Sequence, residues 1–187
     1  MNKVLIFTAV AVLAMGTAVQ ADPTSNAVAH IYATVDPNVA VAAPSAAVDA
    51  GAYQTGTVTG TITFRVDANT QAVSLQVCAS DLWKGDDPTG TDVDPIALDA
   101  TAGATILPTN ANPIGGASNN GPFTTAGTPV EGFPTQCADP ISFESSQNNH
   151  FSQDVTVTVQ WDQTDPEKPQ GEYSGVVQLI AVVLPVG

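Results

Sequence analysis

The chain has 187 residues, with 4 Lys and Arg against 18 Asp and Glu, so its net charge is −14. This balance excludes a nucleic-acid-binding function, because neutralising phosphate requires a basic surface. It also argues against docking on anionic lipid. The charged fraction of 12% is too low for a coiled coil, whose e and g positions need Lys and Glu.

The first 21 residues have the pattern of a secretory signal peptide. Lys3 supplies a positive charge, residues 4–15 form a short apolar run, and Ala18-Val19-Gln20-Ala21 places small residues before a cleavage site. The apolar run is too short to span a bilayer comfortably. We therefore expect residues 1–21 to be removed on export, which leaves no membrane span. An uncleaved anchor is the alternative.

The two cysteines, Cys78 and Cys137, are predicted to form a disulfide, because an even number of cysteines in an exported chain favours pairing. In the chain-entropy model, a closed loop of about 60 residues corresponds to about 4 kcal/mol of stabilisation. A metal site would need further ligands at short spacing, and His30 and His150 lie far apart in the sequence.

Apolar and polar residues alternate with a period of two in several segments, as in half-buried strands. The pattern predicts strands at residues 57–66, 73–78, 154–161 and 173–184. The last of these is apolar on both faces near its end, so we expect it to be a central strand. Trp161 continues an apolar strand face and is expected in the core. No stretch after the leader has convincing helical periodicity, so we predict an all-β chain, a β-sandwich.

Residues 80–150 interrupt the alternation, and they hold 8 of the 14 prolines and 8 of the 15 glycines. Strand signals within this part are short, at residues 104–107 and 141–143. A structureless run of this length is uncommon inside a compact domain. We expect several short edge strands joined by turns and tied back through Cys137.

Residues 26–35 form another alternating segment, and Pro37, which lacks an amide N–H, is expected to end it. Two interpretations are open. The segment is either the first strand of its own sheet or a donor strand that completes the sheet of a neighbouring subunit by strand addition. One of its faces is small and apolar throughout, with Ala27, Ala29, Ile31, Ala33 and Val35.

The two ends of the chain resemble a known family. The sequence Ala33-Thr34-Val35-Asp36-Pro37-Asn38-Val39 is similar to the N-terminus of major pilins of the colonisation-factor type, assembled by the alternate chaperone–usher pathway. Residues 171–180, GEYSGVVQLI, resemble the closing strand of those pilins, which a Gly-x-Tyr motif commonly opens in the broader class. The cysteine pair departs from the colonisation-factor pattern, in which no disulfide is expected.

The resemblance implies an immunoglobulin-like sandwich that lacks one strand and is completed by a donor strand from a neighbouring subunit. Residues 22–37 would be the donor extension and residues 38–187 a single pilin domain. A periplasmic chaperone would cover the open groove until an outer-membrane usher exchanges it for the next subunit. The product would be a homopolymer on the surface of a Gram-negative cell. The plugs would be Ala29, Ile31, Ala33 and Val35, and the groove would be lined by Val177, Leu179, Ala181 and Val183 or by their opposite-face neighbours.

No catalytic motif, phosphate loop or dinucleotide fingerprint is found, so we expect neither an enzyme nor a bound cofactor. A cluster of Asp residues could bind Ca²⁺, which takes six to eight oxygen ligands. The spacing does not match an EF-hand, and a solvated acidic loop is the alternative. The candidate ligands are Asp86, Asp87, Asp92 and Asp94.

Two functions therefore compete. The first is a structural subunit of an extracellular adhesive filament. The second is a self-contained secreted or periplasmic β-sandwich that binds a glycan or Ca²⁺. Pairing of residues 26–35 within their own chain would favour the second.

Overall fold

The computed structural model describes residues 31–43 and 48–184. The predicted leader, residues 1–21, and residues 22–30 lie outside this part, so the prediction of a signal peptide stays a prediction. Residues from Val35 onward form one compact unit, and residues up to Thr34 are separate from it. The fold described below is that of the larger unit.

All regular structure in the described residues is strand, apart from a single 3₁₀ turn, η1 (Ile114–Gly116). Every strand pairing is antiparallel. The strands are β1 (Val39–Ala42), β2 (Gly56–Ala68), β3 (Ala72–Ser80), β4 (Trp83–Lys84), β5 (Ala97–Leu98), β6 (Ala104–Pro108), β7 (Ala111–Pro113), β8 (Asn120–Gly121), β9 (Phe123–Ala126), β10 (Thr135–Ala138), β11 (Ile141–Ser145), β12 (Phe151–Gln163), β13 (Tyr173–Ser174) and β14 (Val177–Val183).

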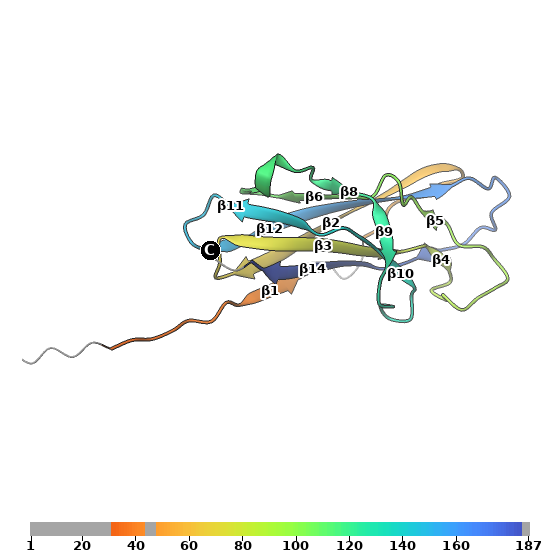
Figure 1. Ribbon diagram of the computed structural model, residues 1–187. Coiled ribbons are helices and arrows are strands. Elements are labelled where there is room, and N and C mark those ends of the chain that lie inside the picture. Colours follow the sequence, from red (N-terminus) through yellow and green to blue (C-terminus); the bar gives the residue numbers. More distant parts are fainter. Residues whose placement is uncertain (1–30, 44–47, 185–187) are drawn as a thin grey trace, which may run out of the picture. The chain divides into compact units, whose positions relative to one another are not determined.

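Two sheets make up the sandwich (Figure 1). The first has the order β1-β2-β12-β6-β8, with β5 also on β12. Its two long strands pair in register over their whole length, from Phe151 opposite Ala68 to Gln163 opposite Gly56. The second has the order β7-β11-β3-β10-β9, with β14 on β3, and β13 and β4 form a separate pair. The prediction of an all-β sandwich is confirmed.

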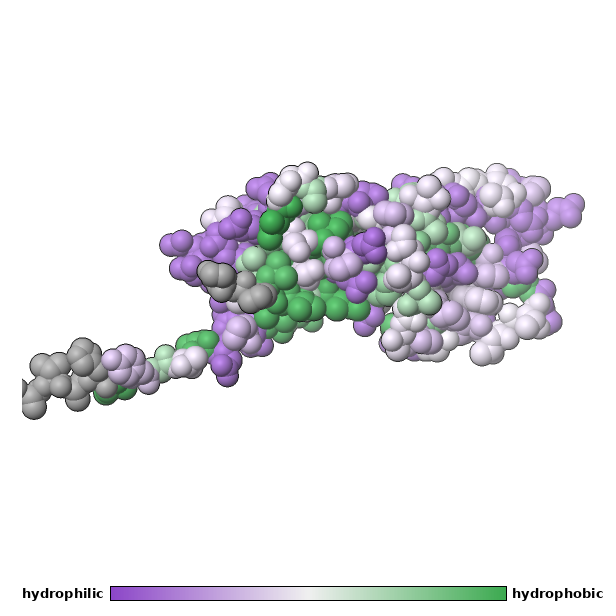
Figure 2. All heavy atoms as spheres, in the orientation of Figure 1, coloured by the Kyte–Doolittle hydropathy of each residue, from purple (hydrophilic) through white to green (hydrophobic). Residues whose placement is uncertain are grey.

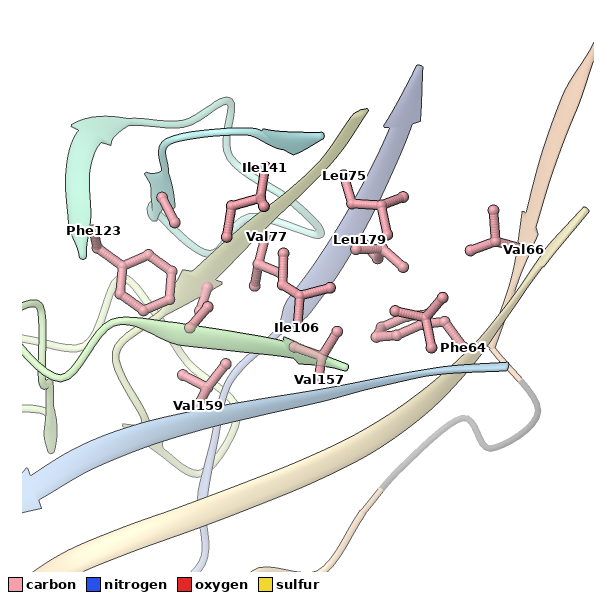
Figure 3. Close-up of a cluster of buried hydrophobic side chains, with 14 of the residues drawn as sticks. Phe64, Val66, Leu75, Val77, Ile106, Phe123, Ile141, Val157, Val159 and Leu179 are labelled. Carbon is pink, nitrogen blue, oxygen red and sulfur yellow. The ribbon is translucent and has the colours of Figure 1, made fainter. Parts of the chain in front are cut away.

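The core lies between the two sheets, and the alternation in the sequence explains which side chains fill it. From Val58 in β2 and throughout β12, every second residue is buried or half-buried, and the residues between them are more exposed polar side chains, most of them Thr and Asp. The labelled side chains of Figure 3 converge from both layers: Phe64, Val66, Leu75, Val77, Ile106, Phe123, Ile141, Val157, Val159 and Leu179.

The predicted disulfide is present. Cys78 and Cys137 lie opposite each other in the β3–β10 pair, with 4.0 Å between their Cα atoms, and both are buried. The Pro- and Gly-rich middle of the chain contains short strands, β4 to β11, as predicted, but three of them, β6, β10 and β11, pair on both sides and are not edge strands. The bond ties this middle part to β3, which lies at the centre of the second sheet.

One prediction about the end of the chain is wrong. Residues 173–184 were expected to form a central strand, but they divide into β13 and β14, and β14 pairs only with β3 in the described residues. Two other strands, β11 and β10, share the opposite edge of β3. An apolar strand therefore lies at an edge of the sheet.

Candidate strand-acceptor site

One edge of β14, here called its free edge, has no partner strand among the described residues. Val176 and Leu184 flank the strand, and both bond to β3 through their main chains, Val176 to Ser80 and Leu184 to Ala72. In an antiparallel pair, residues that bond to the partner alternate with residues that do not. The even-numbered residues of β14 therefore face β3. The odd-numbered residues direct their N–H and C=O groups to the free edge, where the described residues provide no ladder partner.

The same odd-numbered residues direct their side chains to the core. Leu179 is 6% exposed and belongs to the core cluster shown in Figure 3. The other three pack against that cluster while remaining partly exposed: Val177, Ala181 and Val183. These are the four residues that the sequence analysis assigned to the acceptor groove. Both their backbone and their side chains thus lie where an added strand would contact them.

The outer face of β14 is also largely apolar. Ile180 is half-buried and Val182 is 55% exposed, whereas Gln178 supplies the polar position. In Figure 2 hydrophobic residues gather over the face of the molecule that includes β14. An edge strand in contact with water normally carries charged or otherwise protective residues, and β14 has none.

The first sheet is also open on this side. β1 pairs with β2 only from Arg65 to Ala68, so the rest of this edge of β2, residues 56–64, has no ladder partner in the described residues. β1 lies close to β14 in space, although the two do not pair (Figure 1). The connection from β1 to β2 contains Ala50, which packs against the core without forming a strand.

The predicted donor segment is described only in part. Ala29 lies outside the described residues, and Ile31, Ala33 and Val35 are exposed and belong to no strand. The exposed fractions of Ile31 and Val35, 94% and 80%, are unusually large for apolar side chains. Within the described residues, the segment from 31 to 38 is not part of any ladder of its own chain.

The residues that fix the start of β14 were not among those predicted from the sequence. An ideal Cβ at Gly175 would lie 2.6 Å from both the carbonyl oxygen of Asp81 and Oγ of Ser80. Ser80 Oγ accepts a hydrogen bond of 2.9 Å from the N–H of Val176. The Gly-x-Tyr motif lies just before this contact, and its Tyr173 donates a hydrogen bond from its hydroxyl to the carbonyl oxygen of Pro169. Gly175 was visible in the sequence, but its close contact depends on residues far away in the chain.

The acidic segment forms turns rather than a cage for an ion. Among the described residues, no group of three or more His, Cys, Asp or Glu side chains is arranged to hold a metal. Asp87 accepts hydrogen bonds from the N–H and hydroxyl of Thr89, and the hydroxyl bond is the main cause that lowers the pKa of Asp87. Asp86 accepts a bond from the Ser174 hydroxyl. Asp92 and Asp94, the other two candidate ligands, belong to no such group either.

The remaining predictions concern single residues and membrane segments. Trp161 is 4% exposed and belongs to the core, as predicted. His150 is exposed in the turn before β12, whereas His30 lies outside the described residues. A search of the described residues finds no helix with the length and hydropathy needed to cross a membrane.

No protein-family model matches this sequence, and no curated protein matches it.

Proposed function

We propose that this chain is the structural shaft subunit of an extracellular adhesive filament, and that it polymerises by donating its N-terminal segment to the next copy. The observation that carries this proposal is the free edge of β14. Within the described residues β14 is an apolar strand with one ladder partner, so the backbone groups along its other edge have no partner strand there. A strand added at this edge would pair those groups and cover the apolar residues beside them.

The N-terminal segment has the chemistry to be that strand. Ile31, Ala33 and Val35 alternate along it, with Ala29 before them, and the three described residues are exposed. Burial of apolar surface contributes roughly 25 cal/mol per Å². Ala has much less apolar surface to bury than a branched side chain, so its contribution to the free energy is smaller. Ile31 and Val35 would therefore provide most of the side-chain contribution, and backbone hydrogen bonds the rest.

Such a contact would build a fibre. The donor and the acceptor are different surfaces of the same subunit, so every assembly keeps one unused donor at one end and one unused acceptor at the other. In this proposal residues 22–37 are the donor extension. Residues 38–187 form an immunoglobulin-like domain that is incomplete until the strand arrives.

The proposed partners follow from the same open edge. A periplasmic chaperone would cover it before assembly, because an unpaired apolar edge promotes aggregation. An outer-membrane usher would then exchange the chaperone for the next subunit. The place of the finished filament would be the surface of a Gram-negative cell, reached by export through the predicted leader.

The test uses material sheared from the surface of producing cells. It is divided between electron microscopy by negative stain and SDS gels run with and without boiling. We expect filaments, and a ladder of oligomers in the unboiled lane that collapses to one band on boiling. Deletion of residues 24–35 removes the donor and should abolish both the ladder and the filaments.

The opposite result is equally clear. A single monomer band in both lanes, with no filaments on the grid, rejects the proposal. The alternative, a self-contained β-sandwich that binds a glycan or Ca²⁺, would then be tested by titrating purified protein with each. The absence of a carboxylate cluster in the described residues gives the Ca²⁺ version no structural support.

A further inference from the structure

Asn69, in the turn between β2 and β3, holds the root of the N-terminal segment. Its side-chain Oδ1 accepts a hydrogen bond of 2.6 Å from the N–H of Asn38. Its Nδ2 donates a bond of 2.9 Å to the carbonyl oxygen of Asp36. Its backbone N–H donates a third bond, of 3.2 Å, to the carbonyl oxygen of Asn38. We call these three bonds the Asn69 clamp.

The clamp continues a strand pairing beyond its end. β1 begins at Val39, which lies opposite Ala68, so the next position places Asn38 opposite Asn69. The side-chain amide of Asn69 supplies an acceptor and a donor, which are the two groups that the following peptide unit of a strand would offer. Pro37, between the two bonded residues, has a fixed φ angle and adds stiffness. The backbone is thereby held extended up to Asp36.

The clamp lies near the acceptor strand of its own chain, so the N-terminal segment has two possible partners: its own β14 and the β14 of a second copy. The turn that contains Asn69 leads directly into Ala72, whose carbonyl oxygen accepts the main-chain bond of Leu184 at the end of β14. The root of the donor segment and one end of the chain's own acceptor strand are therefore near the same turn. The predicted donor segment, residues 26–35, is longer than β14, which has 7 residues. Length alone would allow the segment to turn back at residues 36–38 and pair with its own β14.

We propose that the Asn69 clamp opposes this reversal and so directs the N-terminal segment to a second copy of the chain. The inference rests on the proposed function and concerns the choice of partner at the same acceptor edge. A reversal at residues 36–38 breaks both side-chain bonds of Asn69, because these bonds require the extended backbone. Without them the segment occupies its own edge, and the subunit becomes a closed monomer.

The experiment compares four forms of the mature chain: wild type, Asn69→Ala, Asn69→Asp and Asn148→Ala. Asn69→Ala loses both side-chain bonds and keeps the backbone bond. Asn69 is not among the residues with positive φ, so alanine introduces no backbone strain. Asn69→Asp keeps the acceptor for Asn38 and loses the donor to Asp36. Asn148 is the matched control, an exposed turn asparagine whose side chain makes no hydrogen bond within the described part.

Two quantities are measured on each form. The first is the fraction of chains in SDS-resistant oligomers before boiling. The second is the hydrogen exchange of the odd-numbered β14 amides, which do not bond to β3, in the monomer fraction, followed by mass spectrometry. For Asn69→Ala we expect the oligomer fraction to fall about thirtyfold, as the loss of two hydrogen bonds of ordinary strength would produce. We also expect these odd-numbered amides to become protected in its monomer, independently of concentration. Asn69→Asp should fall in between, and Asn148→Ala should match wild type.

A further variant excludes a folding defect. Deleting residues 24–35 from Asn69→Ala should expose the β14 amides again, and a synthetic peptide of residues 26–35 should then protect them as it does in wild type with the same deletion. The clamp proposal is overturned if Asn69→Ala forms oligomers as wild type does, or if its monomer leaves β14 unprotected. Wild type that forms no oligomers instead rejects the proposed function itself, and the clamp proposal with it.

Discussion

The indole Nε1 of Trp161 donates a hydrogen bond of 2.7 Å to the carbonyl oxygen of Ser80, which joins the first sheet to the second through the core. Room for the indole comes from Gly60 on the neighbouring strand, where an ideal Cβ would lie 3.0 Å from the ring. The Ser80 hydroxyl then accepts a bond from the N–H of Val176 and donates one to the carbonyl oxygen of Asp81. One buried serine thus connects β12, β3 and the start of the proposed acceptor strand.

Ser80→Ala should destabilise the fold and loosen the start of β14. The change leaves the N–H of Val176 and the carbonyl of Asp81 without their present partner in a site where Ser80 is only 1% exposed. Loss of a buried hydrogen-bonding partner costs about 1–3 kcal/mol. The measurement is the free energy of unfolding from urea titration.

A serine on the same strand provides the control. Ser74 is half-buried on the outer face of β3 and makes no side-chain hydrogen bond among the described residues. Ser74→Ala should therefore change the free energy of unfolding by less than about 0.5 kcal/mol. Equal effects of the two substitutions would contradict the role given to Ser80.

The disulfide should contribute a large part of the stability. It joins residues separated by 59 positions, and the chain-entropy model assigns such a loop about 4 kcal/mol. The double substitution Cys78→Ala and Cys137→Ala should lower the free energy of unfolding by roughly 2–5 kcal/mol. Urea titrations of this variant and of wild type, each with and without reductant, measure the effect. The variant has no disulfide, so reductant should leave its free energy of unfolding unchanged. A change would show that the stability difference from wild type does not come from the disulfide.

Stability should also fall in acid through Asp67. The Arg65 guanidinium bonds to this carboxylate, with 2.8 Å from Nη2 to Oδ1, and lowers its pKa below the ordinary value of 3.8. A depressed pKa in the folded state stabilises it above the unfolded pKa, and this contribution is lost as the pH falls through the folded value. Both groups are exposed, so the effect is small.

The variant Asp67→Asn isolates this contribution. The difference in free energy of unfolding between wild type and Asp67→Asn should be present at pH 7 and should shrink below pH 3.8. Glu144→Gln, which removes an exposed carboxylate with no ion pair in the described residues, controls for the loss of one negative charge. A difference that stays constant with pH would contradict the assignment.

The long strands could be predicted because their signal is local. The alternation in residues 57–66 and 154–161 reports one buried face, and β2 and β12 extend it by only a few residues at each end. Strands of two residues, such as β4 and β5, are too short to show a period. Their positions follow from pairing with distant segments, which a local pattern does not contain.

The character of β14 could be predicted, but its place in the sheet could not. Residues apolar on both faces are typical of a strand with two neighbours, and the described residues provide one. The number of neighbours depends on the rest of the fold. The same holds for Gly175 and Asn69, whose roles depend on Ser80 and on Asp36–Asn38, segments far away in the chain. If a donor strand binds, β14 acquires the second neighbour that its sequence indicates.

Proline substitutions in β14 distinguish the loss of strand addition from the loss of the subunit's own stability. The N–H of Ala181 points to the free edge, so Ala181→Pro removes a donor that β3 does not use, as edge strands tolerate. Ile180 is bonded to β3, so Ile180→Pro removes a ladder bond and should unfold the strand. We expect Ala181→Pro to keep a melting temperature within a few degrees of wild type while losing SDS-resistant oligomers, and Ile180→Pro to lose both. Thermal unfolding and unboiled SDS gels on the same preparations measure the two effects.

Normal oligomers from a folded Ala181→Pro would mean that the added strand does not pair with β14, because the missing donor lies in the middle of the proposed ladder.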